Sequence, residues 1–177
     1  MKILLHACCG VCAAQTIEKL KEEFNEIIIF FYNPNLWPEE ENQKRLEAIK
    51  KVANYHGVKF VEEKPDHEKW LGKIRGLENE PEGGKRCEVC YKMRLEQTAQ
   101  KAKELGCDFF TTTLSISPHK KAEVINSIGR EAGEKFGVEF HEADFKKQDG
   151  FKKTCDLAKQ LNLYRQNYCG CEFSRGE

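Results

Sequence analysis

The chain has 177 residues, and its 29 Lys and Arg balance 29 Asp and Glu, so the formal net charge is zero. This length predicts one domain over residues 1–177, large enough to bury a core without disulfides. The neutral balance excludes a protein that attracts nucleic acid through its overall charge, so any RNA binding is expected from local patches.

The first residues, MKILLHACCGVC, resemble a secretion signal only superficially. The apolar run Ile3–Leu5 is shorter than the roughly 7–15 residues of a signal-peptide core, and it is better explained as a buried strand. No stretch approaches the roughly 20 apolar residues of a membrane span. We therefore expect a cytoplasmic protein without a membrane partner.

Short apolar runs alternate with charged segments of helical period. The runs are rich in β-branched and aromatic residues, which predicts buried strands at Ile3–Leu5, Ile27–Tyr32, Val58–Val61, Asp108–Leu114 and Val138–His141. The segments between and after them predict helices at Ala13–Phe24, Pro38–Tyr55, Cys90–Leu105, Pro118–Phe136 and Gly150–Leu161. The alternation predicts an α/β fold with three layers, a mainly parallel sheet covered by helices on both faces.

One stretch, Asp66–Arg86, breaks this rhythm. It begins with a short helical pattern and continues as an acidic loop rich in Gly and Pro, GLENEPEGGKR. Irregular loops in compact domains are often functional, and a solvated insertion is an equally open alternative.

The nine cysteines are odd in number and clustered. They are Cys8, Cys9, Cys12, Cys87, Cys90, Cys107, Cys155, Cys169 and Cys171. Neighbours within a cluster are too close in sequence to join distant loops. The pattern therefore predicts metal binding or redox chemistry in a reducing compartment.

The first group follows the first predicted strand directly. In open α/β sheets ligands bind beyond the carboxyl ends of the strands. Cys8, Cys9 and Cys12 are thus expected at a strand-to-helix turn, where the helix N-terminus favours thiolates. Packing as small buried apolar residues is the alternative.

The second group, KRCEVC, places Cys87 and Cys90 within one turn of a helix start. A CxxC motif alone occurs in zinc sites, iron–sulfur sites and redox pairs. Together with Cys8 and Cys9 it supplies four thiolates from two loops at one end of the sheet. A structural zinc site remains the alternative, less favoured because a domain of this size folds without one and the two motifs are not matched knuckles.

Isolated residues are interpreted more simply. Cys107 and Cys155 are expected to pack, His6 to be a core histidine near the end of the first strand, and His56 and His67 to lie on the surface. Four polar residues lie near strand ends or motifs, with a structural role equally open for each: Tyr32, Asn33, His119 and Asp144.

Five sequence blocks, in order, resemble the QueH-type epoxyqueuosine reductases. They are HACCGVC, FFYNPNLWPEEENQKR at Phe30–Arg45, RCEVCYKMRL at Arg86–Leu95, TTTLSISPHK at Thr111–Lys120 and LYRQNYCGCEFS at Leu163–Ser174. The resemblance implies a fold similar to the PP-loop ATP pyrophosphatases (HUP-like), with a cysteine-bearing C-terminal tail. HACCGVC stands where those enzymes have an SGGxDS-type phosphate loop, which disfavours an ATP-dependent thiolase.

The resemblance also implies an activity, which is reduction of epoxyqueuosine to queuosine at the tRNA wobble position without cobalamin. It implies a [4Fe–4S] cluster on Cys8, Cys9, Cys87 and Cys90, and a redox-active pair of Cys169 and Cys171. The expected partners are tRNA carrying epoxyqueuosine and an unidentified electron donor.

Epoxide deoxygenation needs two electrons and two protons, whereas a [4Fe–4S] cluster ordinarily passes one electron at a time. The CGC pair is one candidate for a second redox centre. Two cysteines separated by one residue close only a small disulfide ring, whose geometry departs easily from the relaxed dihedral and so makes the bond more reducible. Gly170 gives the ring backbone freedom, and Arg165 would favour thiolates. Unpaired tail cysteines or a metal site are the alternatives. An additional iron near Cys12, which is surplus to four ligands, is the other candidate.

Local basic patches are expected to hold the tRNA, with ordinary solvated lysines as the alternative. The patches are His119–Lys121, Lys146–Lys147, Lys152–Lys153 and Lys85–Arg86. A competing function is a non-catalytic iron–sulfur or zinc module that binds RNA or acts as a sensor. That function does not explain the separate CGC pair.

Overall fold

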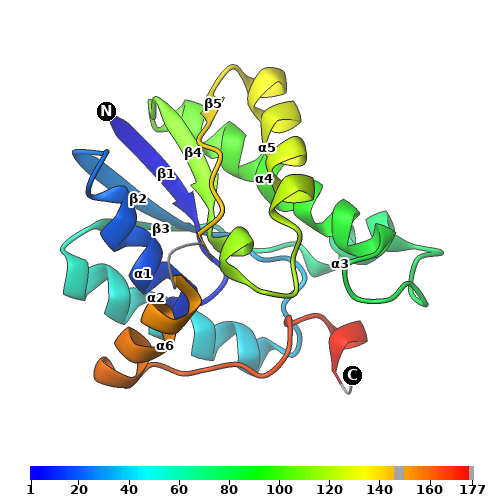
Figure 1. Ribbon diagram of the computed structural model, residues 1–177. Helices are drawn as coiled ribbons and strands as arrows, with labels where there is room; N and C mark the ends of the chain where they lie inside the picture. The colour runs from blue at the N-terminus through cyan, green and yellow to red at the C-terminus, as the bar shows by residue number, and fades with distance from the viewer. Residues whose placement is uncertain (146–149, 176–177) are drawn as a thin grey trace.

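A five-stranded parallel sheet organises the chain (Figure 1). The computed structural model describes residues 1–145 and 150–175. The strands are β1 (Lys2–His6), β2 (Glu26–Phe31), β3 (Lys59–Glu62), β4 (Phe109–Thr112) and β5 (Glu139–Phe140), in the order β3-β2-β1-β4-β5. Every pair of neighbours is parallel, which confirms the predicted sheet.

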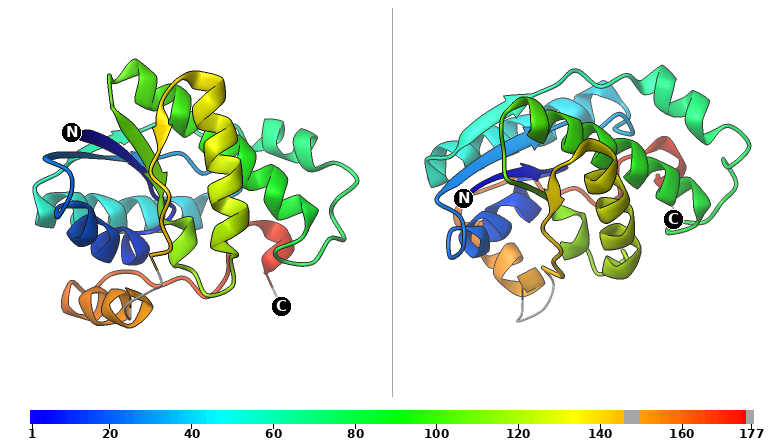
Figure 2. Two further views of the ribbon diagram at one scale, coloured as in Figure 1. Left: turned by 45° about the horizontal axis from the view of Figure 1, so that its top comes forward. Right: turned by 90° about the horizontal axis from the view of Figure 1, so that it is seen from above.

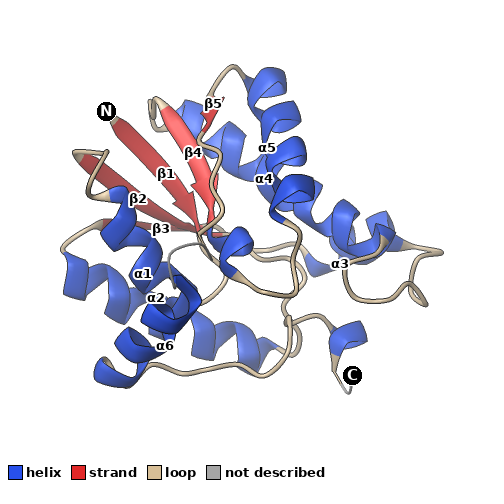
Figure 3. Cartoon of the chain, viewed as in Figure 1, coloured by secondary structure: helices blue, strands red, loops and turns tan. Residues whose placement is uncertain are grey.

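In the described part of the chain, six helices and two short 3-10 turns connect and cover the strands (Figure 3). They are α1 (Gly10–Leu20), α2 (Glu39–His56), α3 (His67–Ile74), α4 (Lys85–Glu104), α5 (Ala122–Phe136), α6 (Gly150–Gln160), η1 (Thr113–Ile116) and η2 (Glu172–Ser174). Helices α1, α2 and α6 lie on one side of the sheet, and α4 and α5 on the other (Figure 2). The expected three layers are confirmed.

The central strands feed two apolar cores. Successive side chains of a strand point to opposite faces, so Ile3 and Leu5 pack toward α1 and α2, whereas Leu4 packs toward α4 and α5. All three are fully buried, as expected for an inner parallel strand.

Several element boundaries differ from the expected ones. Helix α1 begins at Gly10 because the Cys9 side chain accepts a hydrogen bond from the Cys12 backbone N–H, so Cys12 lies inside the helix. Helix α4 begins at Lys85, so the whole CxxC motif is helical. Strand β4 ends early because Thr112 Oγ1 accepts the Leu114 N–H at 3.2 Å and turns the chain into η1.

The strand order reverses between β1 and β4. The chain leaves β1 for β2 on one side, and after β3 it returns to β4 on the other side of β1. Ligands of open α/β sheets bind at such a point, beyond the carboxyl ends of the strands. The segment after α6 crosses this end of the sheet toward α3 (Figure 1).

None of the helices in the described ranges has both the length and the apolar character needed to cross a bilayer.

Candidate cysteine site

The seven cysteines of the three predicted groups gather at the carboxyl end of the sheet. Cys8, Cys9 and Cys12 follow β1, Cys87 and Cys90 lie in the first turns of α4, and Cys169 and Cys171 come from the tail. A cavity of about 460 Å³ opens here, and Cys8, Cys12 and Cys169 line it. The fold therefore brings together cysteines that lie up to 163 positions apart in the sequence (171 − 8).

The four expected cluster ligands lie in adjoining regions. Cys8 packs against both cores, one of which contains Cys9 and the other Cys87. Cys90 and Cys171 share a third, smaller apolar cluster with Trp70 and Ile74. Within residues 1–145 and 150–175, no three His, Cys, Asp or Glu side chains are already arranged around one metal position. The fold thus brings the thiols to one end of the sheet, although their side chains are not arranged around a metal position.

Burial and mutual contact keep these thiols protonated. A hydrogen bond to Cys9 and burial hold the pKa of Cys8 well above its usual range, and a hydrogen bond to Cys12 together with burial raises the pKa of Cys9 to about 12. Burial raises the pKa of Cys90 to about 11 and also raises the pKa of Cys87. A thiolate-binding cation would reverse this preference, because only the thiolate is a good metal ligand.

Arg94 supplies a buried positive charge beside the thiols. It is 1% exposed, its Nη2 donates to Asn33 Oδ1 at 2.7 Å, and its Nη1 lies 4.0 Å from Cys90 Sγ. No carboxylate among the described residues pairs with it. Burial would lower the pKa of Arg94, but the negative charge of Cys90, Cys8 and Cys169 in their thiolate form raises it overall. A buried cation without a carboxylate indicates that this site is built for another anion.

His6 lies beside Arg94 as a neutral residue, with its Nε2 3.4 Å from Arg94 Nε. Its Nδ1 lies 2.8 Å from Thr112 Oγ1 and its Nε2 3.2 Å from the Tyr32 carbonyl oxygen. A carbonyl oxygen only accepts, so Nε2 carries the ring hydrogen and donates to Tyr32, and the unprotonated Nδ1 accepts from the Thr112 hydroxyl. Burial, and then Arg94, hold the pKa of His6 well below its usual range. The expected core histidine is confirmed.

Arg45 attaches the tail to α2. Its Nε pairs with Glu41 at 2.7 Å, while Nη1 and Nη2 donate to the carbonyls of Cys169 and Tyr168 at 3.0 and 3.1 Å. Glu41 also accepts the Tyr164 hydroxyl at 2.6 Å. The residue between the two tail cysteines, Gly170, has φ +119°, and a Cβ there would collide with Leu36 and Arg45. This network places Cys169 at the cavity.

Hydrogen-bond donors without partners surround Cys87. Arg86 is 2% exposed, and its Nη1 donates to the Glu78 carbonyl at 2.8 Å. Its Nε and Nη2, and the Tyr91 hydroxyl, have no partner among the described residues. Gly83 N–H donates to Cys87 Sγ at 3.2 Å. Hydrogen bonds to the sulfurs are among the features that tune iron–sulfur clusters. Among the described residues, buried thiols thus lie beside hydrogen-bond donors without partners and beside a buried cation without a carboxylate. This surrounding fits an anionic cluster.

For three isolated residues, one expectation is confirmed and two are wrong. Cys107 is buried in the core as expected. Cys155 does not simply pack, because it is half-buried, lines the cavity and receives the Arg165 guanidinium at 3.4 Å. His67 is not a free surface residue, since its ring stacks between Trp37 and Trp70 and its Nδ1 lies 2.7 Å from the Pro34 carbonyl. The stack forms only when the loop after β2 meets α3.

The residues of the basic patches fall into four groups. His119 and Lys120 line the cavity, whereas Lys85, Lys152 and Lys153 are exposed outside its lining. Arg86 is buried and therefore is not available to phosphates in this structure. Lys146–Lys147 lie outside the described residues. Of the polar candidates, Asn33 orients Arg94, Tyr32 contributes its carbonyl, and Asp144 is half-buried after β5.

Two buried arginines at the site, Arg94 and Arg45, were not expected from the sequence. A signal was present, because Cys87, Cys90 and Arg94 follow at intervals of three and four, which places them on one helical face. Glu41 and Arg45 have the same spacing of four. Burial, which separates these arginines from solvated ones, appears only in the fold.

Comparisons with known proteins identify the family of the chain. The family model "Epoxyqueuosine reductase QueH" matches residues 3–177. The epoxyqueuosine reductase QueH of Thermotoga maritima is 41% identical over 176 residues, covering 97% of this chain and 89% of that protein. The one from Streptococcus pyogenes serotype M1 is 38% identical over 178 residues, covering 97% of this chain and 69% of that protein.

A solved structure shares the fold. It is the U34-tRNA thiolase NcsA from Methanococcus maripaludis with its [4Fe-4S] cluster, which matches with a TM-score of 0.61 and 16% identity over 98% of this chain and 61% of that chain. At this identity the likeness concerns the fold alone. The family match covers nearly the whole sequence, so this chain belongs to the epoxyqueuosine reductase QueH family, whose members are oxidoreductase enzymes.

Proposed function

We propose that this protein reduces epoxyqueuosine to queuosine at the wobble position of tRNA. A [4Fe–4S] cluster on Cys8, Cys9, Cys87 and Cys90 and the redox pair of Cys169 and Cys171 serve this reaction. The observation that carries the proposal is the meeting of buried thiols from three segments around Arg94, a buried cation without a carboxylate among the described residues.

The stoichiometry suits a dithiol. Converting an epoxide to an alkene breaks two C–O bonds, forms a C=C bond and releases the oxygen as water, which consumes two electrons and two protons. Oxidation of two thiols to one disulfide supplies both pairs. An external reductant, such as a dithiol, must then restore the cysteines. A bound cluster would supply electrons one at a time at the same edge of the sheet.

The placement of the CGC pair supports a relay. Both cysteines are free thiols. Cys171 is buried against the same small cluster as Cys90, while Cys169 lines the cavity with Cys8. One member of the pair therefore lies beside an expected cluster ligand and the other beside the space where a substrate would bind.

Cys12 is a candidate for binding an additional iron. It lines the cavity from the first turn of α1, next to Cys8, and is not needed for a four-thiolate cluster. A second metal there would act on the substrate oxygen as a Lewis acid.

Turnover under anaerobic conditions tests the proposal. Protein reconstituted with iron and sulfide is mixed with tRNA carrying epoxyqueuosine and a chemical reductant, and nucleosides are then identified by mass spectrometry. We expect queuosine to form, and we expect four iron atoms per chain in place of zinc. Iron and tRNA binding without any queuosine would instead favour a non-catalytic RNA-binding module, and bound zinc without iron would contradict the cluster.

A further inference from the structure

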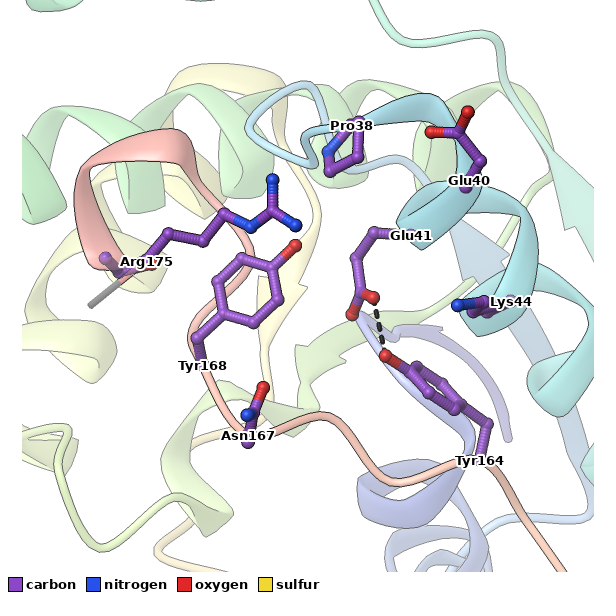
Figure 4. Close-up of a pocket in the computed structure, with 9 residues that line it drawn as sticks. Pro38, Glu40, Glu41, Lys44, Tyr164, Asn167, Tyr168 and Arg175 are labelled. Atoms are coloured by element: carbon purple, nitrogen blue, oxygen red, sulfur yellow. Dashed lines mark hydrogen bonds between the residues drawn. The ribbon is translucent and has the colours of Figure 1, made fainter. Parts of the chain in front are cut away.

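A second cavity adjoins the cysteine cavity. It measures about 490 Å³ and lies between the start of α2 and the tail (Figure 4). Its walls are mostly polar, and Tyr164, Asn167, Tyr168 and Arg175 of the tail face Glu41 and Lys44 of α2. Both cavities fall within the roughly 300–1,000 Å³ of ordinary ligand sites.

The two cavities share a wall. Asn167 and Tyr168 line both of them, so only the thickness of the tail separates the second cavity from Cys169. The wall is firmly held, because Arg45 binds the Tyr168 carbonyl and the Tyr168 hydroxyl donates to the Trp37 carbonyl at 2.6 Å. If one unit of a polymer occupies the cysteine cavity, the next unit therefore lies close to the second cavity.

The second cavity offers cations to a ligand. Lys44 and Arg175 are exposed on opposite walls, 5.6 Å from the Tyr164 ring centre and 5.7 Å from the Tyr168 ring centre respectively. Among the described residues, no carboxylate forms an ion pair with either cation. Glu41 is already engaged by Arg45 and Tyr164, and Glu40 stands on the rim. Two cations beside aromatic rings suit a phosphodiester with an unpaired base.

We infer that this cavity binds the nucleotide that neighbours the modified one in the single-stranded anticodon loop, with Lys44 and Arg175 contacting its flanking phosphates. This inference rests on the proposed function, since it takes tRNA as the substrate. It assigns the tail two tasks, which are carrying Cys169 and separating two adjacent nucleotides.

The test measures binding of a fluorescent anticodon stem–loop RNA at several salt concentrations. The variant is Lys44→Ala with Arg175→Ala, and the matched control is Lys21→Ala with Lys59→Ala, two cations that line a cavity at the opposite end of the sheet. We expect the variant to lose about tenfold or more in affinity and to flatten the salt slope by about 1.4, at about 0.7 per phosphate contact on a single strand. The control should bind like wild type.

Turnover distinguishes this inference from the proposed function. With epoxyqueuosine-containing tRNA, the variant should raise KM while kcat and iron content stay near wild type. A variant with wild-type affinity, salt slope and KM would overturn the inference while leaving wild-type turnover intact. If wild type formed no queuosine but RNA binding still depended on Lys44 and Arg175, the nucleotide site would stand and the proposed reaction would fall.

Discussion

Charged side chains are exposed at the amino end of the sheet, whereas several are buried at its carboxyl end. At the amino end, Lys59 pairs with Glu26 at 2.7 Å and both side chains are well exposed, so the pair is ordinary surface chemistry. At the carboxyl end, Arg45, Arg86 and Arg94 are at most 2% exposed, and only Arg45 has a carboxylate partner among the described residues. Because burying a charge is costly, the difference identifies the end of the sheet that serves function.

Cysteines show the same contrast and provide the largest expected effect. Cys87 at the carboxyl end and Cys107 at the amino end are both 7% exposed. We expect Cys87→Ala to lose most of its iron and all activity, and Cys107→Ala to retain both, because only Cys87 is a proposed ligand. Iron analysis and visible spectra of the reconstituted proteins measure this. A full four-iron content in Cys87→Ala would remove it from the ligand set.

The tail pair should affect turnover but not assembly. Cys169→Ser with Cys171→Ser is expected to keep its iron and to lose multiple turnover, because the relay dithiol is absent. The assay uses the natural electron donor system, with Cys107→Ser as the control for a buried thiol. Full multiple turnover by the double variant would show that the pair is dispensable.

A smaller effect is expected for RNA binding at the cysteine cavity. Lys120→Glu with Lys121→Glu should weaken tRNA binding and reduce its salt dependence, because Lys120 lines the cavity and Lys121 follows it. The matched pair Lys50→Glu with Lys51→Glu lies in the half of α2 that leads to the amino end, and it should change binding much less. Binding that is insensitive to salt in wild type would contradict a phosphate-dominated interface.

Arg94 is expected to tune the redox potential. Replacing Arg94 by Gln removes a positive charge near the thiols and should lower the reduction potential of the reconstituted protein. The expected drop is of the order of 59 mV, which is about a tenfold change for a one-electron couple. Arg94→Lys keeps the charge and should stay closer to wild type, and Lys59→Gln should have no effect. Equal potentials for Arg94→Gln and Arg94→Lys would contradict the electrostatic role.

The smallest expected effects are changes in stability at two glycines, Gly57 and Gly170. Gly57 has φ +64° at the end of α2, and among the described residues no atom outside its chain neighbours lies within 4 Å of the position that an added Cβ would take. At Gly170, with φ +119°, a Cβ would collide with Leu36 and Arg45. We expect Gly57→Ala to cost about 1 kcal/mol. Gly170→Ala should cost more, up to about 3 kcal/mol. Urea unfolding measures both, and equal costs would mean that the tail yields at this point.

The α/β fold, the parallel strands and the family could all be predicted from the sequence, because strand periodicity and five ordered motif blocks are local properties of the chain. The sequence also indicated the cysteine groups as ligands or redox residues, and these roles, like the single-domain organisation, stay predictions. Which charges are buried could not be predicted, because that depends on the tertiary structure. The fold alone brings Arg94 to Cys8, Arg45 to the tail, and Cys155 to the cavity, and the contact of Arg45 with Cys169 joins positions that are 124 apart (169 − 45). Long-range packing sets burial, and burial gives an arginine or a thiol its chemistry.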